Sequence, residues 1–93
     1  MIEVRCTSTD NPLAFDVTVG EGADRSRHHV TMDKASCDRL GGGHDPERLI
    51  AAAFAFLLDR EPKESILARF DVTVISRYFP EFETELPGYL ENS

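Results

Sequence analysis

The stretch DPERLIAAAFAFLLDR, residues 45–60, decides the fold of this chain. Asp45 can cap a helix, Pro46 suits the first helical position, and Glu47 complements the positive end of the helix dipole. The helix should end at about residue 60, because the backbone ahead of Pro62 disfavours helical geometry. Apolar side chains lie nearly all round it, which is typical of a central, mostly buried helix.

Before this helix, apolar and polar residues alternate in two short segments, at residues 2–7 and 15–19, and a third segment at residues 28–32 contains the β-branched pair Val30 and Thr31. This two-residue period is typical of strands that bury one face. Turn-forming residues 8–12 separate the first two segments, and residues 20–24 read as the longer loop of a hairpin between the last two. We therefore predict an antiparallel meander over residues 1–33, with one face buried.

After Pro62 the sequence predicts one or two further short helices. The first covers residues 62–69, with Ile66 and Leu67 turned inward. Residues 71–79 fit two states, because their β-branched run favours a strand whereas their apolar spacing favours a helix. We prefer the helix for this segment.

The chain has 93 residues, which is the size of one domain. We predict a single α+β domain over residues 1–93, in which the N-terminal antiparallel meander packs against the apolar helix at about residues 46–60. Residues 81–93 carry several glutamates and no basic residue, and form an acidic tail that could be flexible.

The formal net charge is −7, which disfavours nucleic acid and anionic membranes as partners. No apolar run approaches the roughly 18 residues that a membrane-spanning helix needs. The first residues also lack the pattern of a signal peptide. We therefore expect a cytoplasmic protein with no membrane partner, and the sequence indicates no oligomeric state.

Few residues suggest chemistry. Cys6 and Cys37 match no zinc or redox spacing, and we expect both to be free thiols. His28 and His29 would point to opposite faces of a strand, so they cannot easily bind one metal ion. Cys37 and His44 could form a thiolate–imidazole pair, but no third group that would orient the histidine is identifiable. No cofactor is expected, and the sequence favours a protein without catalytic activity.

The leading functional hypothesis is a small accessory module that docks on an unknown protein partner. The alternative is a small thiol-dependent enzyme or redox protein that uses Cys37. Aromatic side chains supply large apolar area at low entropic cost, which suits an interface. The predicted contact residues are Tyr78, Phe79, Phe82, Tyr89 and Leu90. The competing interpretation is that Phe79 and Phe82 close over the core.

Short motifs in the chain resemble two families. The stretch FLLDREPKESIL, residues 56–67, with the residues that follow to Pro80, resembles a group of short bacterial proteins of unknown function. This resemblance implies a bacterial origin and a compact unit, and no activity. The stretch GGHDPERLIAA, residues 42–52, is similar to the start of the main helix in OsmC-like peroxide reductases. The catalytic cysteine of that family would fall near Leu57, so this resemblance implies that the peroxidase chemistry is absent.

Overall fold

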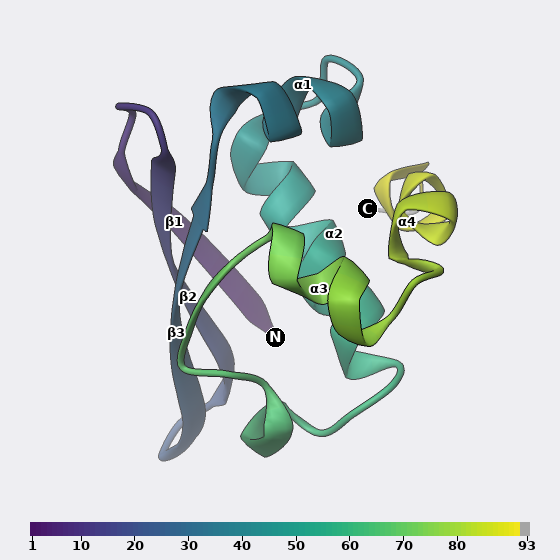
Figure 1. Cartoon of the computed structure of the whole chain (residues 1–93). Coiled ribbons are helices and arrows are strands. Elements are labelled where there is room, and N and C mark those ends of the chain that lie inside the picture. The colour runs from purple at the N-terminus through teal and green to yellow at the C-terminus, as the bar shows by residue number, and fades with distance from the viewer. Residues whose placement is uncertain (92–93) are drawn as a thin grey trace.

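A computed structural model of the chain describes residues 1–91. One sheet has the strand order β1-β2-β3-β4, and the helices lie together on one face of it (Figure 1). The strands are β1 (Ile2–Ser8), β2 (Leu13–Glu21), β3 (Asp24–Met32) and β4 (Arg69–Asp71). The helices are α1 (Lys34–Gly41), α2 (Pro46–Leu58), the short turn η1 (Lys63–Ser65), α3 (Thr73–Tyr78) and α4 (Phe82–Glu91). The predicted α+β class, with an N-terminal meander and a central helix, is confirmed.

The turn between β2 and β3 is tighter than the predicted loop, because the strands pair as far as Glu21 and Asp24. Only Gly22 and Ala23 remain between them. Gly22 adopts a φ of +60°, which glycine tolerates without strain. The third strand of the meander therefore begins at Asp24 rather than at His28.

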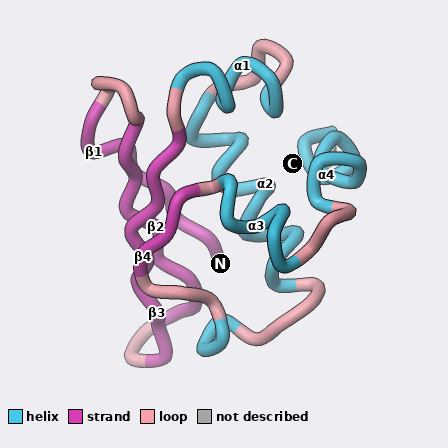
Figure 2. The backbone as a smooth tube through the Cα atoms, in the orientation of Figure 1, coloured by secondary structure: helices cyan, strands magenta, loops and turns pink. Residues whose placement is uncertain are grey.

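A fourth strand, which the sequence did not predict, joins the sheet beside β3 (Figure 2). β4 runs parallel to β3 and places Arg69 beside His29 and Asp71 beside Thr31. One carboxylate oxygen of Asp71 accepts a hydrogen bond from the Thr31 hydroxyl at 2.7 Å, and the other accepts the Thr73 N–H at 3.0 Å. Asp71 thus ends the strand and starts α3, so the helix preferred from the sequence forms from Thr73 onward.

The helix predicted over residues 62–69 does not form beyond the η1 turn. Ile66 is buried as predicted, but Leu67 faces solvent, with 48% of its surface exposed. The reason is a contact with β3, since the buried His28 imidazole hydrogen-bonds the Leu67 carbonyl at 2.7 Å. This bond, across 39 residues of sequence, holds the segment extended and directs it into β4.

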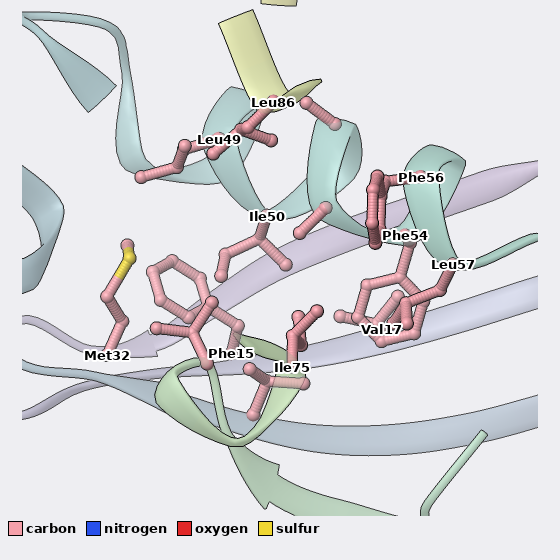
Figure 3. Close-up of a cluster of buried hydrophobic side chains, with 14 of the residues drawn as sticks. Phe15, Val17, Met32, Leu49, Ile50, Phe54, Phe56, Leu57, Ile75 and Leu86 are labelled. Atoms are coloured by element: carbon pink, nitrogen blue, oxygen red, sulfur yellow. The ribbon is translucent and has the colours of Figure 1, made fainter. Parts of the chain in front are cut away.

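α2 begins as the sequence predicts. Asp45 accepts a hydrogen bond from the Glu47 N–H at 3.0 Å, and Pro46 occupies the first turn. The Glu47 carboxylate also reaches the sheet, where it accepts the Cys6 N–H at 2.8 Å. Behind this start, α2 lies across the sheet and supplies much of the core (Figure 3). Its buried residues are Leu49, Ile50, Ala52, Ala53, Phe54, Phe56 and Leu57.

Residues 82–91, predicted as part of an acidic tail that could be flexible, instead form α4 against α2. Phe82, Leu86 and Leu90 follow one another at intervals of four residues and are each at most 3% exposed. That spacing places them on one helical face, so their burial against α2 stabilises the helix. Residues 82–91 are therefore packed against the rest of the domain.

Candidate functional site

The structure separates the predicted contact residues into different environments. Phe82 and Leu90 are buried, at 1% and 3% exposure, so they belong to the core and the contact prediction is wrong for both. Tyr89 is half-buried and packs against the core. Tyr78, at 69% exposure, and the half-buried Phe79 line one groove. This groove is the part of the predicted surface that remains available to a partner.

Tyr89 takes part in a cluster that fastens α4 to α2. At its centre, the Arg60 guanidinium lies 3.6 Å from the centroid of the Phe56 ring. Arg60 donates hydrogen bonds to Glu81 at 3.0 Å and to Glu85 at 2.8 Å, and its Nη1 lies 3.4 Å from the Tyr89 hydroxyl. Because these contacts join the two helices, we assign the cluster to stability rather than to partner binding.

The groove lies between the C-terminal end of α2, the segment from η1 to β4, and α3. It has a volume of about 250 Å³. Its apolar walls come from Leu57, Ile66, Leu67, Phe70, Val74, Ile75, Tyr78 and Phe79. Within residues 1–91, the large hydrophobic side chains that are exposed are Met1, Leu67 and Tyr78. Two of these three therefore meet at one groove.

His28 positions one rim of the groove. Its side chain is buried at 5% exposure, and its ring lies 5.3 Å from the ring of Phe54 in α2. Besides its bond to the Leu67 carbonyl, it shares a 2.8 Å hydrogen bond with the Ser26 hydroxyl. A buried imidazole with both nitrogens satisfied is held in one orientation. The Leu67 side chain consequently stays turned toward solvent at the groove edge.

Glu61 supplies the one carboxylate among the groove residues. It is half-buried, and within residues 1–91 its carboxylate makes no hydrogen bond or ion pair. Its neighbour Lys63 is already paired with Asp24 at 3.1 Å and with Glu64 at 2.9 Å. An unpaired carboxylate beside apolar walls can form an ion pair with a cationic group of a bound molecule.

Comparisons with known proteins do not indicate a function for this chain, so the proposal below is based on the geometry of the groove. No protein family, no curated protein and no solved structure matches the chain. The resemblances to short bacterial proteins and to OsmC-like reductases therefore stay predictions. At the position where the OsmC-like resemblance would place a cysteine, Leu57 forms part of the groove wall. Within residues 1–91, no helix is long and apolar enough to cross a membrane.

The residues suggested for thiol chemistry are not paired. The His44 imidazole hydrogen-bonds the Gly41 carbonyl at 2.6 Å rather than the Cys37 thiol. Desolvation, reinforced by the charges of Asp38 and Asp45, raises the pKa of the Cys37 thiol above its ordinary value. Within residues 1–91, no group of three or more His, Cys, Asp or Glu side chains is placed to hold a metal ion.

We expect Cys37 to react with iodoacetamide more slowly than free cysteine near pH 8, because its raised pKa lowers the thiolate fraction. Mass spectrometry of a Cys6→Ser chain would measure this rate on Cys37 alone. The same chain unfolded in urea should react at the rate of free cysteine. A folded-state rate above that of free cysteine would support the thiol-dependent alternative instead.

Proposed function

We propose that this chain is a non-enzymatic interaction module that binds a protein partner in the groove between α2, β4 and α3. One observation carries the proposal: Leu67 and Tyr78, both large and exposed, line the same apolar groove. Single exposed hydrophobic residues are common on protein surfaces and need no explanation. Two of them around a groove with apolar walls are typical of a binding site.

The chemistry of the groove indicates what it binds. A volume of about 250 Å³ admits one large aromatic or aliphatic side chain with part of its backbone. The free carboxylate of Glu61 would pair with a Lys or Arg next to that anchor. The net charge of −7 would also draw a basic segment toward the protein. The proposed ligand is therefore a protein segment with one large apolar residue and an adjacent basic residue.

The alternative of a thiol-dependent enzyme has less support. Partial burial, with the charges of Asp38 and Asp45, raises the pKa of the Cys37 thiol, and a reactive cysteine needs the opposite shift. His44 is engaged with the backbone and does not act as a base toward this thiol. We therefore favour the interaction module.

Selection from a displayed library of random ten-residue peptides tests the proposal. Peptides that bind the wild-type chain should be enriched in one large apolar residue beside Lys or Arg. We expect the Leu67→Ser and Tyr78→Ser variants to bind the enriched peptides at least about tenfold more weakly, because each loses an exposed apolar wall of the groove. Glu61→Gln should reduce the preference for the basic residue. Fluorescence anisotropy would measure each affinity.

The matched control is Thr84→Ser, which changes an exposed residue of α4 outside the groove. It should bind the enriched peptides like the wild-type chain. All variants should show wild-type melting temperatures, since Leu67 and Tyr78 are exposed. Equal binding of the peptides to wild-type chain and both groove variants would refute the proposal, as would a library that yields no peptide above background.

A further inference from the structure

The face of the sheet opposite the helices carries side chains that the groove does not use. Strand pairing places Arg5, Asp16, His29 and Arg69 in one row across the four strands. Arg27 lies two residues before His29 on β3 and therefore points to the same face. The sequence alone shows only a short basic run in β3. The parallel pairing of β4 with β3, which the sequence did not predict, places Arg69 beside this basic run.

Part of this row is neutralised within the chain. Asp16 contacts His29 at 3.1 Å and Arg5 at 3.5 Å. The hydrogen bond from His29, more than the one from Arg5, holds the pKa of Asp16 below its ordinary value, so this carboxylate is charged at neutral pH. Arg27 and Arg69 differ, because both are exposed and neither makes a side-chain hydrogen bond or ion pair within residues 1–91.

The two unpaired arginines are close enough to act together. Arg69 is the direct neighbour of His29, and Arg27 is displaced by two residues along β3. Strand spacing and rise place their Cα atoms about 8 Å apart. Both residues line one hollow on this face, together with His29, Thr18 and Arg5. Two carboxylates, Asp16 and Glu3, line it as well, so the three arginines exceed the acidic residues by one. Each guanidinium presents a planar fork of donors that matches a phosphate or carboxylate group.

We propose that Arg27 and Arg69, flanking His29, bind one phosphate group in this hollow. A phosphate dianion can accept hydrogen bonds from both guanidinium groups at once. A single carboxylate has fewer acceptor oxygens and fits two guanidinium groups less well. The site suits a compact anion, because the Debye length is about 8 Å at physiological salt and the chain as a whole repels an extended polyanion. Its source is either a small phosphate ester or a phosphorylated side chain of a protein.

Titrations followed by amide chemical shifts test this site and separate the two sources. The probes are inorganic phosphate, a short phosphoserine peptide and the same peptide without phosphate. We expect saturable shifts in β3 and β4 with phosphate, with a dissociation constant of about 5 mM or lower at 0.15 M salt. Tighter binding of the phosphopeptide than of phosphate assigns the site to a modified protein. Equal binding assigns it to a small ester.

The variants Arg27→Gln and Arg69→Gln should each weaken phosphate binding about tenfold, because each removes one guanidinium fork. Arg77→Gln is the matched control, since Arg77 is also exposed and unpaired within residues 1–91 but lies on α3, away from the hollow. Equal losses in all three variants would mean nonspecific charge attraction and overturn the proposal. So would shifts that never saturate, or an unphosphorylated peptide that binds as well as its phosphorylated form.

Discussion

A chain that ends at Pro80 should fail to fold cooperatively. The truncation removes Phe82, Leu86 and Leu90, which are at most 3% exposed and pack against the core. Losing each large buried apolar side chain costs about 2–5 kcal/mol, whereas a small domain is stable by only about 5–15 kcal/mol in total. Thermal unfolding followed by circular dichroism, and the dispersion of amide proton shifts, would show the loss.

Single substitutions in α4 separate this explanation from a general effect of truncation. Leu86→Ala should lower the free energy of unfolding by about 2–4 kcal/mol, because it opens a cavity beneath α4. Thr84→Ala, on the exposed face of the same helix, should stay within about 0.5 kcal/mol of the wild-type value. If the truncated chain melted at the wild-type temperature, α4 would not belong to the core.

The Phe56→Ala chain should lose about 3–5 kcal/mol of stability in urea unfolding. Phe56 is fully buried in α2, and the rings of Phe79, Phe82 and Tyr89 meet it edge-on at centroid distances of 5.9, 5.0 and 5.8 Å. Aromatic pairs in this arrangement stabilise beyond their buried area. Removal of this ring would also leave the Arg60 guanidinium without the aromatic face that it covers.

Phe56→Leu is the control for this substitution, because it keeps most of the apolar volume and removes the ring. It should cost less than half as much as Phe56→Ala, and the difference separates the cavity from the aromatic contacts. Equal midpoints for Phe56→Ala and wild-type chains would show that the α2–α4 packing does not form in solution.

Local patterns predicted those parts of the fold whose cause lies within a few residues. Alternation along residues 2–7 and 15–19 reflects burial of one sheet face, and the structure places strands there. Asp45 and Pro46 mark a helix start through bonds that the first turn makes with itself, so α2 could be located within a residue or two. Each of these signals needs no knowledge of the distant chain.

The missed elements depend on contacts between distant segments. β4 has only three residues, which is too short for alternation to indicate a strand, and it forms because its backbone pairs with β3. α4 contains Pro87, which argues against a helix when only local preferences are considered, whereas packing against α2 offsets that preference.

The residues of the groove likewise include some that the local sequence indicates and others that depend on distant contacts. The sequence singled out Tyr78 and Phe79 as candidate contacts because aromatic residues can be recognised from residue type alone. Leu67 was assigned to the interior, since nothing near it in sequence shows that His28 hydrogen-bonds its carbonyl and turns the segment outward. Glu61 has no local signal of a binding role, because its place on an apolar wall depends on how α3 packs.

The bond between Glu47 and the Cys6 N–H has a consequence for aggregation. β1 is an edge strand, and edge strands offer free backbone groups to which strands of other chains can add. The backbone N–H of Cys6 already donates a hydrogen bond to the carboxylate of Glu47, which lies at the start of α2. A foreign strand that added here would have to displace a charged acceptor and bury it without a partner. One residue at the start of the central helix thus also occupies a backbone donor of β1 that an added strand would need.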